Sequence, residues 1–107
     1  MDDIKKVSVL GTEYTIEQKP EDERMFIGDG FCDRTTKRIV LDRMDKGNLD
    51  DPKEYRKQVL RHELTHAFFF ESGLTDCYKP SNDETLVDWI AYQFPKMIEA
   101  FRKADAL

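Results

Sequence analysis

Both histidines of this chain lie in one short motif, His62-Glu63-Leu64-Thr65-His66. On a helix, residues four positions apart share one face, so the two imidazoles can reach a single cation. Zinc accepts such a pair of nitrogens, and a glutamate directly after the first histidine stands beside the ion. A carboxylate in that place can take a proton from water. We therefore expect His62 and His66 to bind Zn²⁺ and Glu63 to act as the general base of a hydrolase.

A catalytic zinc site also needs a third protein ligand and an open coordination position. No histidine remains, and Phe69 and Ser72 stand where a metzincin has a glycine and a further histidine. The third ligand must therefore be acidic. Glu84 is the first candidate and Asp76 is the alternative. On spacing alone, Glu84 could equally cap a helix through the pattern Ser81-x-x-Glu84.

Asp88 follows Glu84 by four residues, so the two carboxylates face the same way on a helix. Asp88 could accept the outer N–H of a ligand histidine, which would hold that ring in its orientation. The alternative is an exposed helical carboxylate. Asp88 lies between Val87 and Trp89 in an apolar stretch, however, where an unpaired charge is costly.

Peptide hydrolysis would further need a donor for the oxyanion and a place for the substrate. Tyr78 is the first candidate donor and Tyr92 the second, although either could be a packing residue. The run Arg38-Ile39-Val40-Leu41 could be an edge strand beside the zinc helix. Arg38, Ile39 and Val40 would then bind an extended peptide by main-chain pairing. The same run could instead be an internal strand.

Residues 61–67, followed by residues 84–91, resemble the ImmA/IrrE-type zinc metallopeptidases and the minimal gluzincins. In that family the H-E-x-x-H helix is followed by a helix that carries a glutamate ligand. The later part of its pattern is matched loosely by Val87, Asp88, Ile90 and Ala91 and by the pair Phe94-Pro95. The likeness covers residues 52–97.

This resemblance implies a zincin-like fold, with Glu84 as the third ligand and an intracellular protein as the substrate. Val87 is bulkier than the alanine usual in the family. No helix-turn-helix domain is attached, so a role linked to DNA is not expected. Short single-domain forms of this kind look like proteins encoded by bacteria and their prophages.

The elements that must position these residues fall into two halves, divided near residue 50. The first half carries strand-like runs at residues 6–10 and 13–17, joined by a turn at Gly11-Thr12. Further runs lie at residues 25–27, 31–33 and 38–42, with a turn at 34–37. We expect three or four antiparallel strands here.

The second half is helical. Asp51 can cap a helix in which Pro52 is the first residue and Glu54 completes a capping box. Apolar residues at helical spacing continue to Glu71, and Ser72-Gly73 is a typical end. A second helix is expected to begin at Ser81 or Asn82 and to be kinked or broken by Pro95 near Phe94.

Composition limits the classes of function. The chain has 107 residues and a net charge of −5, which argues against a nucleic-acid-binding module. Its longest apolar run, residues 67–70, is too short to cross a membrane, and the N-terminus has no secretory signal. We therefore expect a cytoplasmic protein. Its two cysteines, Cys32 and Cys77, are expected to be free thiols.

Together these features predict one α+β domain over residues 1–107, strand-rich at 4–48 and helical at 51–106. A small antiparallel sheet would pack on the zinc helix, and a second helix would close the site, as in a minimal zincin. The leading function is a zinc-dependent endopeptidase whose partner is a protein or peptide substrate, with a regulatory protein as a further candidate. One alternative is a non-catalytic regulatory or binding domain stabilised by zinc. Another is an interaction protein whose motif is incidental.

Overall fold

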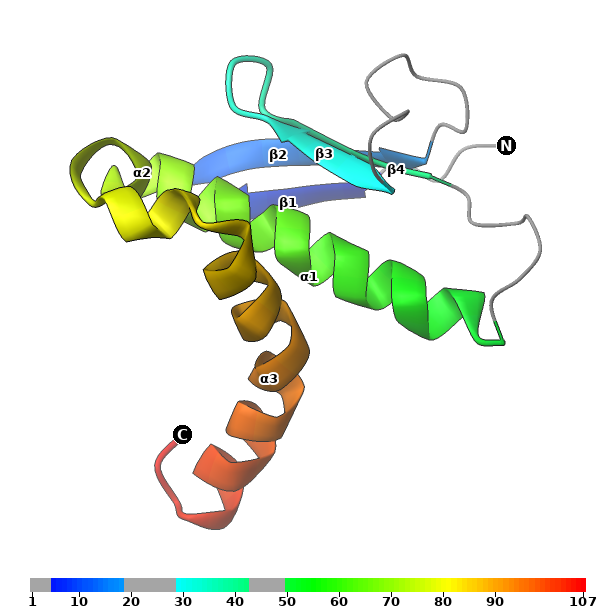
Figure 1. Cartoon of the computed structure of the whole chain (residues 1–107), viewed down its shortest axis with the longest axis vertical. Coiled ribbons are helices and arrows are strands. Elements are labelled where there is room, and N and C mark those ends of the chain that lie inside the picture. The colour runs from blue at the N-terminus through cyan, green and yellow to red at the C-terminus, as the bar shows by residue number, and fades with distance from the viewer. Residues whose placement is uncertain (1–4, 19–28, 43–49) are drawn as a thin grey trace.

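A four-stranded sheet lies against a long helix in the computed structural model, which describes residues 5–18, 29–42 and 50–107 (Figure 1). The elements in chain order are β1 (Lys5–Val9), β2 (Thr12–Gln18), β3 (Gly30–Asp33), β4 (Arg38–Leu41), α1 (Pro52–Glu71), α2 (Leu74–Cys77), η2 (Lys79–Asn82) and α3 (Glu84–Lys103). Helix α3 projects away from α1 and the sheet. The predicted α+β class is therefore confirmed. The strand expected at residues 25–27 lies outside the described residues.

The sheet is mixed, so the expectation of a purely antiparallel sheet is wrong. Its strand order is β1-β2-β4-β3, with β2 and β4 parallel and the other two pairs antiparallel. Strand β4 is paired on both sides, so the edge strand expected at residues 38–41 is wrong too. Ile39 and Val40 point to opposite faces and both are fully buried. A strand that is apolar on both faces belongs in the middle of a sheet.

The hairpin between β1 and β2 turns at Leu10-Gly11, one residue earlier than expected. Val9 pairs with Thr12, which leaves a two-residue loop. Leu10 and Gly11 both have positive φ, at 51° and 88°. These angles are typical of the type I′ turn, whose twist matches that of the flanking strands.

One face of the sheet and one face of α1 form the core. Alternate residues of the strands point toward α1, as the period of two requires. The buried residues of this cluster are Val9, Tyr14, Ile16, Ile39, Leu41 and Ala67. The half-buried Val59, Leu60 and Leu64 of α1 pack against the same cluster. The sheet therefore sets the rotation of α1, and with it the direction in which the motif residues point.

Helix α1 begins and ends where the sequence predicts. The Asp51 side chain accepts a hydrogen bond from the Glu54 backbone N–H, and Pro52 is the first helical residue. At the other end the chain leaves the helix through Gly73, whose φ of 82° favours glycine. The motif at residues 62–66 therefore lies well inside a regular helix.

Helix α3 begins at Glu84, two to three residues after the expected start near Ser81 or Asn82. Asp83 is the N-cap, and its side chain accepts a hydrogen bond from the Thr85 backbone N–H at 2.9 Å. Ser81 is buried and donates its hydroxyl to the carbonyl oxygens of Tyr78 and Leu74 instead. Ser81 thus holds the corner before α3, and Glu84 is not part of a capping box with it.

Helix α3 continues through Pro95 to Lys103, so the predicted break near Phe94 is wrong. Proline lacks the N–H that would bond the carbonyl four residues earlier, which is that of Ala91. The Nε–H of Arg61 donates to this carbonyl oxygen at 2.6 Å. A side chain of α1 therefore replaces the missing helical hydrogen bond.

Within the described part of the chain, no helix combines the length and the apolar character that a membrane span requires.

Candidate metal centre

The two histidines of the motif and Glu84 meet at the crossing of α1 and α3. The Oε1 atom of Glu84 lies 2.7 Å from Nε2 of His62 and 3.2 Å from Nε2 of His66. The two imidazole rings have their centroids 5.0 Å apart. The carboxylate of Glu84, the first residue of α3, thus contacts the Nε2 atom of both histidine rings on α1.

Asp88 contacts the other side of the first ring. Its Oδ1 atom lies 2.9 Å from Nδ1 of His62. His62 therefore has a carboxylate oxygen at each of its two nitrogens, although a neutral imidazole carries only one N–H. With its N–H on Nδ1, a neutral His62 ring has no hydrogen on Nε2 for Glu84, so a cation shared by Nε2 and the Glu84 carboxylate would complete this contact.

The spacing of these donor atoms suits a zinc ion. Ligand atoms about 2 Å from a tetrahedral cation are about 3.3 Å from one another. The distances from Glu84 to the two Nε2 atoms, 2.7 and 3.2 Å, are near that spacing. Both distances would have to lengthen only slightly for a zinc ion to lie among the three atoms. Imidazole nitrogen and carboxylate oxygen are also ligands that zinc prefers. The residues present therefore fit zinc.

Glu63 lies beside the same site but has a different environment. Its side chain is buried, with 7% exposed, and no hydrogen bond or ion pair engages it among the described residues. Its carboxylate lies within 4.8 Å of the ligand atoms of His62 and His66. Burial raises the pKa of Glu63 to about 7, and the charge of Glu84 acts in the same direction. A buried, unpaired carboxylate beside two imidazoles is a candidate general base.

Glu63 and Glu84 are both close enough to the histidines to be considered as the third ligand. Glu84 contacts both Nε2 atoms directly, whereas no direct contact joins Glu63 to either ring. Glu84 is therefore the better-placed candidate for the third ligand.

Two cavities open onto the site. The larger, about 600 Å³, is lined by Asp29, Gly30, Tyr55, Gln58, Val59, His62, Glu63, Glu84, Asp88 and Tyr92. The smaller, about 300 Å³, is lined by Gly30, Phe31, Cys32, His62, Glu63, His66, Phe70 and Glu84. Gly30, His62, Glu63 and Glu84 border both cavities. A substrate could therefore approach the candidate metal position along β3.

Gly30 borders both cavities because β3 runs very close to α1. A Cβ atom added to Gly30 would lie 3.0 Å from Cγ1 of Val59 and 3.1 Å from Cδ2 of Leu41. Only glycine fits this close approach without displacing a neighbour. No pattern in the sequence singled out Gly30 for this role.

The remaining sequence candidates lie in different places. Tyr92 lines the larger cavity, whereas Tyr78 is 51% exposed and lines neither cavity. The role expected of Tyr78 stays a prediction. Asp76, the alternative ligand, is bonded to Arg34 at 2.9 and 3.2 Å and does not reach the histidines. Arg38 pairs with Glu17 at 3.1 Å, within the sheet.

A chain of contacts supports the ring of His66. Phe70, four residues further along α1, stacks on this ring with centroids 5.9 Å apart. The Arg34 guanidinium lies 4.9 Å from the centroid of Phe70, and Asp76 holds that guanidinium. The turn between β3 and β4 thus braces the second histidine through an aromatic side chain. The i, i+4 spacing of His66 and Phe70 was the signal available in the sequence.

Both cysteines are free thiols, as predicted. Cys32 lines the smaller cavity, and burial raises the pKa of its thiol to about 12, with the Glu63 charge as the next cause. Cys77 is exposed on α2. Because metals bind the thiolate, the high pKa of Cys32 disfavours it as a ligand.

No family model, curated protein or solved structure matches the chain. Its function must therefore be argued from the arrangement of its own side chains.

Proposed function

We propose that this chain is a zinc-dependent peptidase of the ImmA/IrrE type, acting on a protein or peptide substrate. One observation carries the proposal: the Glu84 carboxylate contacts Nε2 of both histidines, while the Glu63 side chain, only 7% exposed, stands beside them and has no hydrogen bond to any of the described residues. Three ligands and one neighbouring base are the parts that a catalytic zinc site requires.

Each residue of the candidate metal centre has a separate role in this proposal. His62, His66 and Glu84 hold the ion, and Asp88 keeps the His62 ring oriented by accepting from Nδ1–H. A bound zinc ion would supply Lewis acidity, which polarises a peptide carbonyl and makes water a better proton donor. The other contributions come from the protein.

Glu63 receives the proton of the attacking water and returns it to the leaving amine. Glu63 lines both cavities, so a substrate bound in either one would lie beside its carboxylate. Tyr92 lines the larger cavity and is the better-placed donor for the oxyanion. The substrate lies along the cavities that Gly30 borders, instead of along residues 38–40.

The experiment measures zinc content and peptide cleavage on the same protein samples. The wild-type chain should bind one zinc per chain and cleave members of a mixed peptide library, as followed by mass spectrometry. Glu63→Gln should keep the zinc and lose cleavage, whereas Glu84→Gln should lose both. Glu99→Gln is the matched control, since it neutralises an exposed carboxylate at the far end of α3, and it should keep both. Full cleavage by Glu63→Gln would contradict the assigned base.

A second function is favoured by the position of the ligands on two different helices. Zinc held by His62 and His66 of α1 and by Glu84 of α3 would join the two helices, and so could act as a structural staple. In that case zinc would raise the midpoint of thermal unfolding, and no peptide in the library would be cut. Unfolding curves with and without a chelator, alongside the cleavage assay, separate the two functions.

A further inference from the structure

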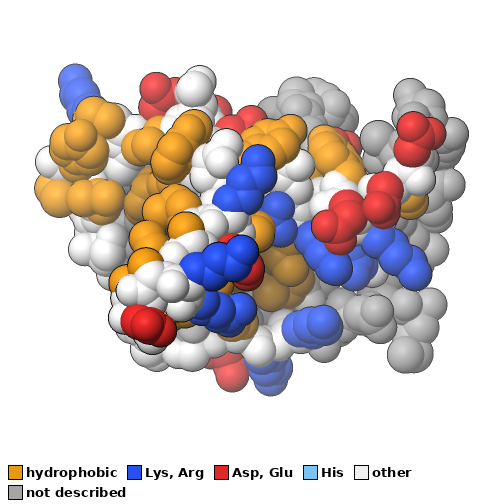
Figure 2. Space-filling model, turned by 90° about the horizontal axis from the view of Figure 1, so that it is seen from below, with side chains coloured by type: hydrophobic (Ala, Val, Ile, Leu, Met, Phe, Trp, Pro, Cys, Tyr) orange, Lys and Arg blue, Asp and Glu red, His pale blue; other side chains and the backbone are white. Residues whose placement is uncertain are grey.

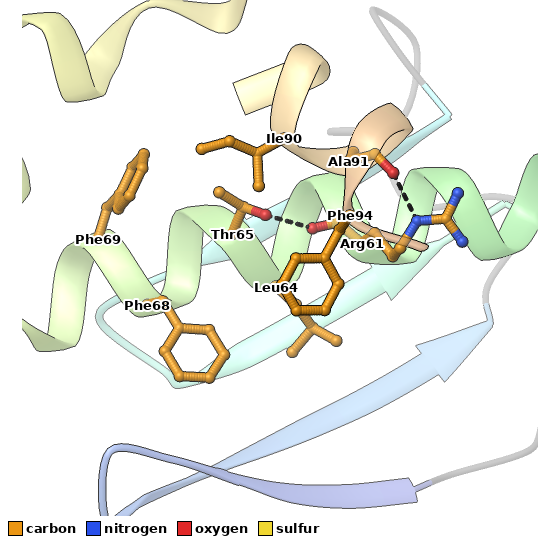
Figure 3. Close-up of a pocket in the computed structure, with 8 residues that line it drawn as sticks. All are labelled: Arg61, Leu64, Thr65, Phe68, Phe69, Ile90, Ala91 and Phe94. Carbon is orange, nitrogen blue, oxygen red and sulfur yellow. Dashed lines mark hydrogen bonds between the residues drawn. The ribbon is translucent and has the colours of Figure 1, made fainter. Parts of the chain in front are cut away.

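A second concave surface lies on the side of α1 away from the candidate metal centre. It is a cavity of about 450 Å³ between α1 and α3, lined by Arg61, Leu64, Thr65, Phe68, Phe69, Ile90, Ala91 and Phe94 (Figure 3). We call it the α1–α3 groove. It shares no lining residue with the two cavities at the metal centre. The groove is therefore separate from the metal centre in its lining residues.

The groove offers little to a polar ligand. Thr65 donates its hydroxyl to the carbonyl oxygen of Arg61 at 2.7 Å, and the Nε–H of Arg61 is donated to the carbonyl oxygen of Ala91. Figure 3 shows the rings of Phe68 and Phe94 beside Leu64 on the open side. Phe68 and Phe94 are 44% and 45% exposed. An apolar partner is therefore expected.

The outer half of α3 has a complementary surface. Beyond Gln93 it projects away from the rest of the molecule (Figure 1). Phe94, Met97, Ile98 and Phe101 recur there at the spacing of one helical face, and Phe101 is 40% exposed. We call these four residues the α3 stripe. An amphipathic helix with such a stripe is what a groove between two helices accepts.

We propose that the α1–α3 groove of one chain receives the α3 stripe of a second copy, in a twofold-symmetric dimer. Phe94 belongs to both the groove and the stripe, so a twofold axis close to Phe94 lets each copy give and receive the same contact. The pair is closed, because both apolar surfaces of each copy are used within it. Hydrophobic side chains also gather on the face from which α3 projects (Figure 2).

The area is sufficient for such a dimer. At about 200 Å² for each aromatic side chain, the exposed parts of Phe68, Phe94 and Phe101 and their half-buried neighbours offer about 400 Å² per copy. Two copies then bury about 800 Å² of apolar surface. Because interfaces are about 60% apolar, the whole contact is about 1,300 Å², which lies within the range of specific interfaces.

The charges of α3 favour the same arrangement. The helix has Glu84 in its first turn and Arg102 and Lys103 in its last turn. A twofold axis near Phe94 makes the two α3 helices antiparallel, with the acidic start of one toward the basic end of the other. The opposed helix dipoles are favourable as well.

The test is the mass of the full chain in solution, measured by sedimentation between about 5 and 200 μM, a range that covers dimers of ordinary affinity. The expected mass at the upper end is twice the 12.6 kDa of one chain. Phe94→Glu and Phe101→Glu should each weaken the dimer at least about tenfold, as charged substitutions at central aromatic residues do. Circular dichroism should show that both variants remain helical.

Trp89→Glu is the matched control. Trp89 is 54% exposed on the same helix but lies five residues from Phe94, about 140° around the helix, and does not line the groove. This variant should remain a dimer. A wild-type chain that stays monomeric throughout the range would mean that another partner fills the groove, and it would overturn the proposal. A dimer that tolerates Phe94→Glu, or that loses stability equally with Trp89→Glu, would overturn it too.

Discussion

The Nε–H of Arg61 donates at 2.6 Å to the carbonyl oxygen of Ala91, whose helical donor has been replaced by Pro95. This contact joins the two helices that carry the candidate metal ligands. Arg61 directly precedes His62, and Ala91 lies three residues after Asp88, so the contact is within one turn of the site on each helix. Pro95 thus frees an acceptor inside α3, and α1 uses it to fix the helix crossing.

We predict that the effects of Arg61 and Pro95 on stability are coupled. Arg61→Met should lower the free energy of unfolding by about 1.5–3 kcal/mol, the usual loss for a hydrogen bond to a charged group. In a Pro95→Ala background the Ala91 carbonyl regains a helical donor, so the same substitution should cost less. Urea unfolding of the four proteins gives the coupling energy. Arg56→Met, a loss of charge on the same helix, is the control, and additive effects would contradict the explanation.

The contact of Asp88 with His62 leads to a prediction about zinc affinity. Asp88→Ala removes the acceptor at Nδ1, 2.9 Å away, but leaves all three proposed ligands in place. Zinc should still bind with one ion per chain, but about 10–100-fold more weakly. Competition with a chelator of known affinity measures the change. Glu99→Ala, at the other end of α3, should leave the affinity as it is in the wild-type chain. Unchanged affinity in Asp88→Ala would mean that Asp88 does not orient the ring.

Gly30 should be sensitive to the smallest possible addition. Gly30→Ala places a Cβ atom 3.0 Å from Val59, which should push β3 away from α1 and cost about 1–3 kcal/mol of stability. Because Gly30 borders both cavities at the site, zinc affinity should fall as well. Gly11→Ala is the contrasting variant, since its positive φ makes the substitution strained far from the site. It should lower the unfolding midpoint only, and an equal loss of zinc affinity in both variants would argue against a local effect.

Glu71 at the end of α1 predicts a dependence of stability on pH. The Lys37 ammonium at 2.8 Å, and next the Tyr14 hydroxyl at 2.6 Å, lower the pKa of Glu71 from 4.5 to about 2. Folding therefore favours the ionised carboxylate. Its contribution to stability is complete above about pH 4.5 and is lost as the pH falls toward 2.

Urea unfolding at several pH values between 2 and 6 tests this prediction. Glu71→Gln should flatten the change in unfolding free energy over that window, because the amide does not titrate. Glu13→Gln is the control: Glu13 is two-thirds exposed and 3.9 Å from Lys6, a contact that contributes little. If both variants keep the wild-type slope, another carboxylate is responsible for the acid sensitivity.

Local signals in the sequence were strong for α1 and misleading for α3. Asp51, Pro52 and Gly73 each act on the backbone within a few residues, so the bounds of α1 could be predicted. Ser81 satisfies an equally good local pattern, but its hydroxyl is used by Tyr78 and Leu74 in a corner that forms only when the chain folds back. Pro95 was predicted to kink or break α3. The helix does not break there, and the donor that compensates for Pro95 comes from another helix, which the local sequence could not reveal.

Sheet order was harder to predict than the strands themselves. The runs at β1, β2, β3 and β4 could be recognised from alternating apolar and polar residues and from the turns between them. These signals define two hairpins, β1–β2 and β3–β4, but they do not decide whether β3 or β4 lies beside β2. The three consecutive apolar residues Ile39, Val40 and Leu41 were a signal for a central strand, and the alternative of an internal strand was the right one.

The sequence by itself determined that two imidazoles lie on one face of a helix with a carboxylate between them, because helical periodicity is a local property. It also offered Glu84 as the first candidate for the third ligand and Asp76 as the alternative, and the family resemblance favoured Glu84. Only the tertiary structure brought Glu84 to both histidines and Asp76 to Arg34, since that choice depends on how α3 crosses α1. The crossing in turn depends on Arg61 reaching a carbonyl that lies thirty residues away in the chain.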